Sequence, residues 1–518
     1  MIRKAAGRTA GRKSTWISDP DVSSYHSGPY GETRAFDSAE ASNSWSVLKF
    51  PMNFPRRFLL SSFAIIALNG CGVSAVSMHG QVTVPADWKN AAGFPVASPS
   101  RDLSRWWKRF DDPGLSRIIS DALGNSPDMA TAAARIREAR SRRDAEAASL
   151  FPTLRGAASA SGSSVSSDGI SSDWNGGSSS SAALNASWEA DLFGKRRNTI
   201  EAATAQVGAT EENLNSVQAA LSSEIAIAYT RLRVAEAALE VLLRTIKTRE
   251  ETSQLATWRT QSGEADSLES NQALSSLEQA RSGVPALRQA ISQSQNLLAL
   301  LAGRTPGSLD GQLASGKQRI PNPSVSLAIG IPADTLRQRP DVRLAGYQLL
   351  AAAARTRATD AERFPALNLS GSLGVNALGA GKLFTPETAS AAAIGSLTGP
   401  IFDAGRIRAN IAAQSAAEEQ AFQTYRSTVL TALSEVEDSL IACRRTNERL
   451  ESLEKATAAA REAATLAQLR YQAGVTDILT VLDAQRSLLG LEDSLFSVRA
   501  NRTIAYIQLY KALGGGWS

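Results

Sequence analysis

The chain has almost none of the side chains that enzymes and metal proteins most often use for chemistry. Its 518 residues include two histidines, His26 and His79, and two cysteines, Cys71 and Cys443. A zinc site needs three or four His, Cys or carboxylate ligands at short spacing, and no His/Cys cluster of that kind is present. The sequence also lacks a phosphate-binding glycine loop. We therefore predict a protein that is not an enzyme and that uses no cofactor and no metal.

Aromatic residues and long apolar runs are also scarce. Aromatics make up 6% of the chain, which is low for a large globular core, whereas the abundant Ala, Ser, Leu, Gln, Glu and Arg suit long helices. No apolar run reaches the 18 residues or more that a transmembrane helix needs. Residues 1–70 hold 9 of the 55 basic and 5 of the 50 acidic residues, which leaves the rest of the chain at a net charge of +1. That balance provides no basic field for nucleic acid.

The amino-terminal region contains an export signal. Residues 1–51 are polar and show no periodic apolar pattern. Residues 52–70 contain the charged pair Arg56-Arg57, the apolar stretch Phe58–Leu68 and then small residues, which is the order of a secretory signal peptide. Because such a signal normally begins the chain, we predict that residues 1–51 are a non-native or dispensable extension.

Cys71 follows the signal directly, in the sequence Leu68-Asn69-Gly70-Cys71. This resembles a bacterial lipobox, in which the cysteine is lipidated and becomes the new amino terminus, so that residues 71–111 form an anchored segment. The alternative is an ordinary signal peptide with a chance cysteine. Cys443 lies on a helical stripe and is predicted to be a small core residue. With one thiol left after lipidation, no intrachain disulfide is possible.

The rest of the chain is a duplication. Residues 255–273 and 466–484 share eight identical residues at a constant offset of 211 positions. Copies of about 200 residues are too long to be units of a solenoid. We predict two repeats, residues 112–320 and 321–518, each with a helix, a β-hairpin and a long helical hairpin in the same order.

Each repeat contains two segments in which apolar and polar residues alternate with a period of two. They span about 153–163 and 180–191 in the first repeat, and 367–376 and 393–401 in the second. Strands of roughly ten residues with alternating faces suit the wall of an outer-membrane barrel. They equally suit a soluble hairpin, and the strands alone leave both possibilities open.

Long helices follow each strand pair. Apolar residues recur at spacings of three or four, after one spacing of seven, from Val207 to Leu242, and at every third or fourth position from Phe422 to Cys443, which predicts coiled-coil seams. Each helix is predicted to run for about 50 residues, or roughly 75 Å, and to turn near Gly263 or Gly474 into a second helix that returns. Residues 514–516 are three glycines, which we predict to be a flexible tail.

An export signal combined with alternating strands implies that the strands of several chains together close one sheet. In lipid every backbone N–H and C=O group needs a partner, so a sheet there must close. Four strands cannot close a barrel and leave two open edges. Three chains give twelve strands, enough for an open lumen, because side chains just fill a barrel of about eight. We predict a mainly α protein with a membrane β portion, in which three chains close a 12-stranded β-barrel and their helices form a matching ring below it.

Several short motifs together carry a family resemblance. In the order and spacing of these motifs, the chain resembles the TolC-like outer-membrane efflux family, and within it the NodT/OprM-type RND efflux lipoproteins, over about residues 68–516. The motifs are Cys71 with its lipobox, Trp106-Trp107, Phe110 with Asp112-Pro113, the segment from Trp188 to Gly194, the segment from Leu336 to Val342, the segment from Phe402 to Arg406, and Arg470-Tyr471-Gln472-Ala473-Gly474 leading to the segment from Val481 to Arg486.

The resemblance implies the exit duct of a tripartite efflux system. Such a duct is a homotrimer in which a 12-stranded β-barrel is continuous with a 12-helix α-barrel. It is lipid-anchored in the outer membrane and extends into the periplasm. It passively conducts small molecules or drugs from a periplasmic adaptor (membrane fusion) protein and an inner-membrane RND-type pump to the exterior. The alternatives are an outlet for type I protein secretion and a trimeric adhesin or structural coiled coil. The lipobox favours small-molecule efflux over the first, and the separated strand pairs count against the second.

The resemblance also implies a closed periplasmic gate, which Leu479, Asp483 and Arg486 of the second repeat would line or brace. A ring of three Asp483 carboxylates would select cations, and Arg486, three positions along the same helix face, would relieve their mutual repulsion. The alternative is an ordinary surface pair. Some relatives carry a second Asp where this chain has Thr480, so the charged ring is expected to be weaker here.

The helical hairpin tips are predicted to dock the adaptor. Gly263 and Gly474 mark the turns, because glycine accepts a positive φ and a close approach of backbone. In the second repeat Ala473, Val475 and Thr476 surround the glycine and are expected to take part. The alternative is that both glycines serve the turns alone.

Overall fold

The computed structural model describes residues 83–91, 94, 103–165, 175–314, 319–323, 332–378, 383 and 385–517. All of them belong to one compact unit, residues 74–518. The predicted extension, the signal peptide and the lipid anchor Cys71 lie outside the described residues.

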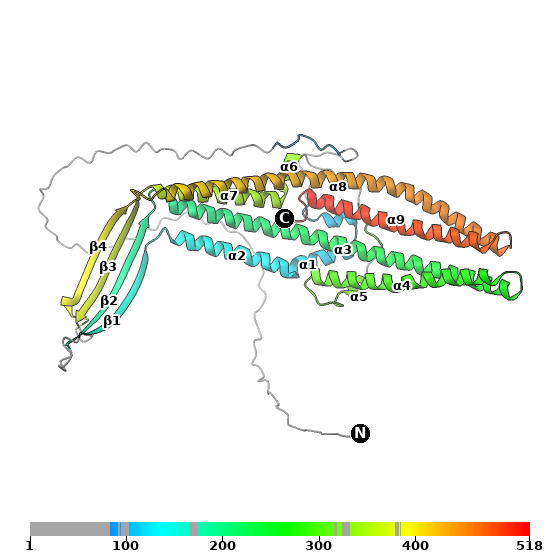
Figure 1. The fold of residues 1–518 in the computed structure, drawn as a ribbon, viewed down its shortest axis with the longest axis horizontal. Coiled ribbons are helices and arrows are strands. Elements are labelled where there is room, and N and C mark those ends of the chain that lie inside the picture. Colours follow the sequence, from blue (N-terminus) through cyan, green and yellow to red (C-terminus); the bar gives the residue numbers. More distant parts are fainter. Residues whose placement is uncertain are drawn as a thin grey trace, which may run out of the picture. The chain divides into compact units, whose positions relative to one another are not determined.

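The two halves of this unit contain the same elements in the same order (Figure 1). The first half has α1 (Pro113–Asn125), α2 (Pro127–Ala148), β1 (Thr153–Val165), β2 (Asn175–Ala190), α3 (Lys195–Gln261) and α4 (Ser267–Leu301). The second has α6 (Pro332–Gln338), α7 (Pro340–Asp360), β3 (Ala366–Leu378), β4 (Ala389–Thr398), α8 (Arg406–Gln472) and α9 (Ile478–Ala512). Four short helices lie before or between these elements. They are η1 (Trp106–Phe110), which precedes α1, and α5 (Asp310–Ala314), η2 (Ala361–Arg363) and η4 (Pro386–Thr388) in the connections.

The long helices have equal lengths in the two halves. Helices α3 and α8 are 67 residues each, and α4 and α9 are 35 residues each. At 1.5 Å per residue, 67 residues extend about 100 Å, so the prediction of about 50 residues was too short. It followed the apolar seam, whereas helix α8 begins at Arg406 and contains many alanines before Phe422. Alanine has the strongest helix propensity and extends a helix without an apolar seam.

An aspartate fixes the start of each long helix where the chain leaves the sheet. Asp191 accepts hydrogen bonds from the backbone N–H groups of Arg196 and Arg197, and Asp403 accepts from those at the start of α8. Although partial burial opposes it, these hydrogen bonds hold the pKa of Asp191 below its ordinary value. The backbone N–H groups of Ile407 and Gly405 likewise lower the pKa of Asp403. Each carboxylate thus satisfies the free N–H groups of a helix amino terminus.

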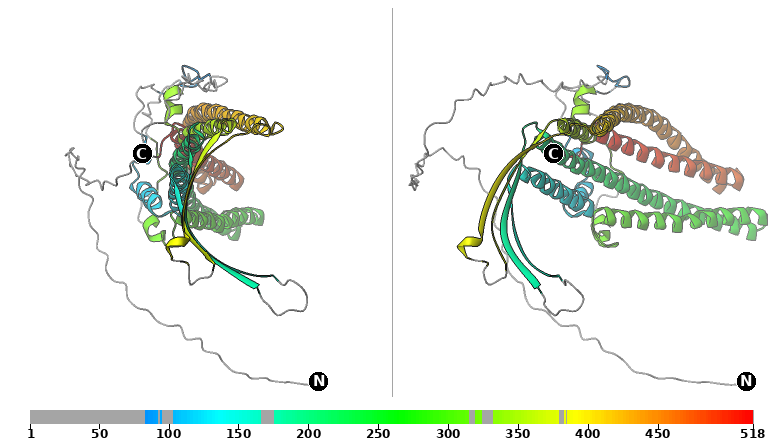
Figure 2. Two further views of the ribbon diagram at one scale, coloured as in Figure 1. Left: turned by 90° about the vertical axis from the view of Figure 1, so that its left-hand side faces the viewer. Right: turned by 60° about the vertical axis from the view of Figure 1, so that its left-hand side comes forward.

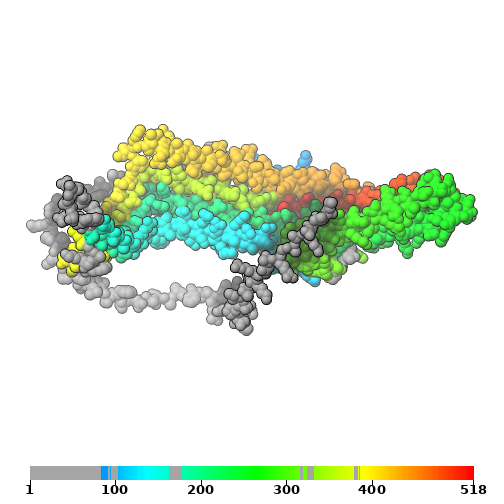
Figure 3. All heavy atoms as spheres, turned by 60° about the horizontal axis from the view of Figure 1, so that its bottom comes forward, coloured from blue at the N-terminus to red at the C-terminus, as the bar shows by residue number. Residues whose placement is uncertain are grey.

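The helices form a single layer that is four helices wide in both halves of its length (Figures 1 and 2). In the half nearer the strands the order is α2, α3, α7, α8, since α3 contacts α2 and α7, and α7 contacts α8. In the far half the order is α4, α3, α9, α8. Figure 3 shows α2 and α4 following one another along the length of the body. Helices α2 and α4 therefore form one edge of the layer, and α8 forms the other.

The strands form one antiparallel sheet in the order β1, β2, β3, β4, and the pairing of β2 with β3 joins the two halves. The sheet extends beyond the ends of the helices (Figure 1). Its register places apolar side chains opposite one another on one face, with Leu184 opposite Leu373 and Leu367 opposite Leu397. The other face is mainly polar, with Ile394 as an apolar exception, and hydroxyls hydrogen-bond across it, as Ser159 does to Ser181 at 2.8 Å.

Both faces of the sheet are exposed. On the apolar face, Leu154, Leu373 and Leu397 are 68%, 61% and 66% exposed, and every residue of β4 is exposed. A sheet of a soluble protein normally packs its apolar face on a core. Within the part of the chain that the structure describes, the sheet therefore has two exposed faces of different polarity, which is the pattern predicted for a membrane wall.

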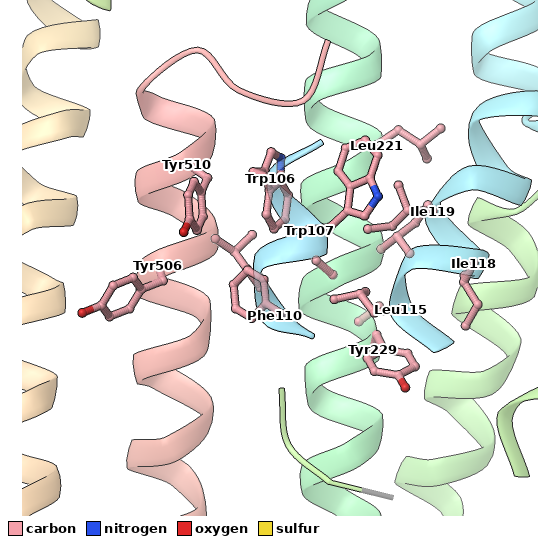
Figure 4. Packing of buried hydrophobic residues seen from close by; sticks show 14 of the residues in the cluster. Trp106, Trp107, Phe110, Leu115, Ile118, Ile119, Leu221, Tyr229, Tyr506 and Tyr510 are labelled. Atoms are coloured by element: carbon pink, nitrogen blue, oxygen red, sulfur yellow. The ribbon is translucent and has the colours of Figure 1, made fainter. Parts of the chain in front are cut away.

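The main core lies at the middle of the helical layer (Figure 4). The ring of Trp106 stacks on Tyr510 with 5.5 Å between centroids, and Phe110 packs edge-on against both. Tyr229 donates to the Asp112 carboxylate at 3.1 Å and accepts from Arg233 at 3.1 Å. This core joins the first residues of the unit to the last helix. Cys443 is fully buried within it, which confirms its predicted role, and burial raises the pKa of its thiol to about 12.

The predicted flexible tail was wrong. The backbone N–H of Gly516 donates to the carbonyl of Leu103 at 3.0 Å, and a Cβ added to Gly516 would lie 2.8 Å from the hydroxyl of Ser222. A Cβ added to Gly515 would lie 2.9 Å from the carbonyl oxygen of Tyr510. These glycines are present because the backbone passes close to the core, and the carboxyl-terminal segment is part of that core.

Candidate gate at the helical hairpin tips

The two turns between the long helices lie at equivalent positions. Gly263 has φ of 77° and Gly474 has φ of 71°, a conformation that residues with a side chain adopt at a cost. Asp266 and Asp477 then cap α4 and α9 by accepting the backbone N–H of Leu268 and Thr480, at 3.2 and 3.0 Å. Each turn is thus closed by a glycine and an aspartate placed three residues apart.

The residues predicted to dock an adaptor gather at these turns. Ala473 is the C-cap of α8, Gly474 forms the turn, and Val475 is 74% exposed beside it. Thr476 is half-buried, and Gly263 lies at the corresponding place on the other hairpin. The second turn therefore presents a small, mostly apolar surface.

The predicted gate residues lie on successive turns at the start of α9. Leu479 is half-exposed, and Arg486 donates to the Asp483 carboxylate at 3.2 Å. Both of these charged side chains are about three-quarters exposed, at 75% and 74%. An exposed pair of this kind contributes little to the stability of one chain. Its functional significance depends on what lies opposite it in an assembly.

A second arginine, Arg249, lines the same cavity as Arg486. Arg249 of α3 is buried and donates to the carbonyl of Ser276 at 2.8 Å. Burial, and then the positive charge of Arg486, lower the pKa of Arg249. A cavity of about 370 Å³ separates α3, α4 and α9 here, and Arg249, Arg486 and Asp493 line it. Arg486 thus contacts the exposed Asp483 and lines the same cavity as the buried Arg249, whose positive charge disfavours its approach.

One contact that the sequence did not predict joins the two hairpins next to their tips. The buried Tyr471 of α8 donates its hydroxyl to the carboxylate of Glu269 on α4. The guanidinium of Arg259 on α3 lies over the Tyr471 ring at 5.0 Å and 3.7 Å from the Glu269 carboxylate. Burial and the neighbouring Glu269 raise the pKa of Tyr471 to about 12. We call these three residues the tip latch.

Two further contacts hold α3 against the second hairpin above the tip latch. Ala467, Tyr471, Ile478, Val481 and Leu482 form an apolar cluster, on which Leu255 of α3 packs. One turn further along α3, Thr252 donates to Gln468 at 3.2 Å and accepts from Gln485 at 3.4 Å. The two hairpins of one chain are therefore joined by polar and apolar contacts along this seam.

A comparison of the two repeats could have identified the tip latch. At the offset of 211, Tyr471 corresponds to Thr260 and Glu269 corresponds to Thr480. The two repeats therefore differ at both ends of the hydroxyl–carboxylate contact, next to positions where they are identical. Arg259 corresponds to Arg470, so the repeats are identical at this position and their comparison would not have identified Arg259.

No helix in the described part of the chain is both long and apolar enough to cross a membrane. Among the same residues, no group of three or more His, Cys, Asp or Glu side chains could hold a metal ion. What the described residues do form is a two-faced sheet continued by one layer of helices.

Comparison with known proteins identifies the family. The outer membrane efflux protein family model matches residues 118–304 and 331–515, one match in each half, and the chain belongs to this family. It is 32% identical over 462 residues to the pyoverdine export outer membrane protein OpmQ of Pseudomonas aeruginosa, covering 88% of this chain and 96% of that relative.

Solved structures agree with this assignment. The structure of the outer-membrane channel OprN superposes with a TM-score of 0.78 at 32% identity, covering 84% of this chain and 98% of that one. The open state of the MtrE outer membrane channel of Neisseria gonorrhoeae superposes with a TM-score of 0.76 at 31% identity, covering 85% and 97%. The predicted family is confirmed, and with it a fold in which a small sheet continues a mostly helical body.

Proposed function

We propose that the chain is the outer-membrane exit duct of a tripartite efflux system, which passively conducts small molecules from a periplasmic adaptor and an inner-membrane RND-type pump to the exterior. The observation that carries this proposal is the sheet, whose apolar face is exposed among the described residues. An exposed apolar band of this kind is stable where lipid covers it. The polar face then lines a water-filled lumen.

A homotrimer follows from the open edges. Strand β1 forms one edge of the sheet and β4 the other, and unpaired edges are costly in lipid. The helical layer likewise ends at α2 and α4 on one side and at α8 on the other. Three copies supply a 12-stranded β-barrel and a 12-helix α-barrel, which leave a lumen wider than side chains can fill.

The periplasmic end is the gate. In a trimer, Leu479, Asp483 and Arg486 recur three times around the axis, and the Asp483 carboxylates form a ring that favours cations. Arg486 moderates their mutual repulsion. The tip latch holds the two hairpins of each chain together in the resting state. An adaptor that docks on the tips at Gly263 and from Ala473 to Thr476 shifts the hairpins toward an open arrangement.

The lipid anchor is Cys71, which places the amino terminus of the mature chain in the membrane. The relatives favour small-molecule efflux over type I protein secretion, since their names refer to pyoverdine export and to solvent efflux. A trimeric adhesin or structural coiled coil is the less favoured alternative, because the strand pairs lie in separate halves of the chain.

Efflux in cells tests the function. The full-length gene is expressed together with the genes of a candidate adaptor and RND-type pump in a Gram-negative host that lacks its own outer-membrane efflux channel. We expect ethidium accumulation to fall to the level of the same host with its own efflux channel intact. Unchanged accumulation, with the protein present in the outer membrane and the pump and adaptor expressed, would contradict the proposal.

The anchor has its own test. Cys71→Ser is expected to abolish incorporation of radiolabelled palmitate, while Cys443→Ser retains it. Labelling that persists in Cys71→Ser would show that Cys71 is not the lipidated residue.

A further inference from the structure

The cavity between α3, α4 and α9 contains a buried arginine that lacks a counter-ion among the described residues. Arg249 is 5% exposed, and its guanidinium donates to the backbone carbonyl of Ser276 at 2.8 Å. Within the same part of the chain, no carboxylate pairs with this guanidinium, and its Nε–H has no acceptor. Burial of an unpaired charge is unfavourable, because the protein replaces little of the water that it displaces. Arg249 therefore provides a binding partner for an anion.

Arg486 provides a second positive charge at the same cavity. Burial lowers the pKa of Arg249, and the charge of Arg486 lowers it further, because the two guanidinium groups repel each other. The contact of Arg486 with Asp483 at 3.2 Å is exposed, and an exposed ion pair contributes little free energy. Arg486 can therefore exchange Asp483 for an anion in the cavity, and an anion between the two arginines relieves their repulsion.

The rest of the cavity lining is largely apolar. Leu242 of α3, Leu287 of α4 and Leu489 of α9 line it, and the first two belong to the apolar cluster between α3 and α4. The volume of about 370 Å³ is at the lower end of the range for small-molecule sites. Along α9 the lining extends from Arg486 to Asp493, which is about 10 Å at 1.5 Å per residue. The cavity thus offers a cationic end and an apolar wall.

Asp493 lies at the other end of this lining and is exposed. A carboxylate at that position repels a second negative charge on a ligand whose first charge is held by the arginines. The lining therefore favours a ligand with one anionic end and an uncharged remainder.

The shape shared by the two repeats does not require this cavity. At the offset of 211, Arg249 corresponds to Ala460 and Gly283 corresponds to Ser494. Gly283 lines the cavity, and a Cβ added there would lie 3.1 Å from Cδ2 of Leu242. The first repeat therefore has an arginine where the second has a methyl group, and it has no side chain where the second has one. Both differences provide charge or space for a ligand.

We propose that this cavity binds an organic monocarboxylate, with its carboxylate between Arg249 and Arg486 and its apolar body along the three leucines. Guanidinium groups suit this ligand, because their paired N–H donors match the two oxygens of a carboxylate. The apolar body gains free energy by leaving water for the leucine wall. The binding site is formed by one chain and does not depend on an assembly.

Access to the site from the bore rests on the exit duct proposed above. Asp483, Arg486 and Asp493 lie on one face of α9, since residues three and seven positions apart share a helix face. In the proposed duct this face lines the bore, so a carboxylate in transit meets Arg486 first. Once Arg486 holds the ligand, it no longer offsets the charge of Asp483.

Isothermal titration calorimetry of the full-length protein in detergent tests the site. The probe is 4-phenylbutyrate, and the matched control ligand is 4-phenylbutanol, which has the same apolar body without the carboxylate. We expect saturable binding of one 4-phenylbutyrate per chain and no saturable binding of the alcohol. Equal affinity for the two ligands would overturn the role of the arginines.

Variants of α3 locate the site. Arg249→Gln is expected to weaken binding of 4-phenylbutyrate by roughly ten-fold or more, because hydrogen bonds to a charged group are lost. Arg244→Gln is the matched control, since Arg244 lies on the same helix in an exposed pair with Glu240, and its affinity should equal that of the parent. An unchanged affinity in folded Arg249→Gln would refute the site.

Two further variants keep the test decisive if Arg249→Gln does not fold. Gly283→Leu retains both arginines and fills the cavity beside Leu242, and it should abolish binding. Asp493→Asn tests the orientation of the ligand. A dicarboxylate, 4-(3-carboxypropyl)benzoate, should bind the parent more weakly than 4-phenylbutyrate does, and Asp493→Asn should reduce this difference. Binding that survives Gly283→Leu would place the ligand elsewhere, and a difference unaffected by Asp493→Asn would contradict the orientation.

Planar-bilayer recording separates the failure of this site from the failure of the proposed duct. In the parent, 4-phenylbutyrate is expected to raise the cation-to-anion permeability ratio, because Asp483 loses its counter-ion, and Arg249→Gln should show no such rise. Conducting channels whose protein binds no 4-phenylbutyrate would overturn the site and leave the duct standing. Saturable binding by a protein that forms no channels would contradict the duct and leave the site standing.

Discussion

The two helical hairpins have the same shape and differ in the residues that join them to their surroundings. They share helix lengths, glycine turns and aspartate caps. Even the cross-helix ion pair is retained with its charges exchanged, as Glu250 with Arg281 at 2.6 Å in the first and Glu492 with Arg461 at 2.7 Å in the second. The shape follows from the shared positions, so the differing positions are where distinct functions can be located.

The tip latch is the largest of these differences. Tyr471→Phe removes the hydroxyl that binds Glu269, a hydrogen bond to a charged group that is worth about 1.5–3 kcal/mol. If the latch stabilises the closed state, the open-to-closed ratio should rise by roughly ten-fold or more, since 1.4 kcal/mol is a factor of ten. Single-channel recording in planar bilayers measures this ratio.

Thr260→Ala is the matched control, because Thr260 occupies the place of Tyr471 in the first repeat. Its open probability is expected to remain near that of the parent. An equal rise in both variants would show that the two tips do not differ as proposed.

The turns offer a test of what the hairpins share. Gly263→Ala and Gly474→Ala each place a side chain at a positive φ, which costs about 1 kcal/mol or more, while nothing lies near the added methyl at either site. Both variants should lose similar thermal stability in detergent, measured by circular dichroism at 222 nm. Strongly unequal losses would mean that one turn carries a contact that the other lacks.

The proposed ring of Asp483 carboxylates tests a further position at which the two hairpins differ. Asp483→Ala is expected to raise conductance and to move the cation-to-anion permeability ratio toward one, because three negative charges leave the lumen. Its counterpart in the first repeat is Gln272, and Gln272→Ala should alter neither. Reversal potentials in a salt gradient provide the measurement. Unchanged reversal potentials for Asp483→Ala would remove Asp483 from the gate.

The exchanged ion pairs should give the smallest effect. Arg281 and Glu250 are exposed, and exposed ion pairs contribute little to stability. Glu250→Arg alone should lower thermal stability slightly through repulsion with Arg281. Adding Arg281→Glu should restore it, since the first hairpin then has the charge order of the second. Failure of the double variant to recover would show that the polarity of the pair matters beyond its own contact.

Much of the fold could be predicted from periodicity. Alternation with a period of two located all four strands to within a few residues, apart from the start of β2 at Asn175, and the three-four spacing located the long helices. Helix length was underestimated because alanine-rich turns such as those before Phe422 extend a helix without an apolar seam. The packed tail was missed because three glycines also suit a flexible chain, and their need for close backbone contact becomes visible when Leu103 and Ser222 are in place.

The candidate site was only partly predictable. Asp483 and Arg486 share a helix face by spacing alone, and the structure places them in contact. Tyr471 and Glu269 are 202 positions apart, and neither has a local pattern that requires a partner. Their pairing depends on α8 lying beside the first hairpin, which is a tertiary relationship. The difference between the repeats was the available signal, because Tyr471 and Glu269 both replace threonines of the other copy.

The central claim is that this chain is one third of a tube wall. Electron cryomicroscopy of the full-length protein in lipid nanodiscs tests it most directly. We expect a three-fold particle with an open bore, in which β4 of each copy lies beside β1 of the next and α8 lies beside α2 and α4 of the next. A single copy whose sheet is covered by its own helices, with no bore, would contradict the account.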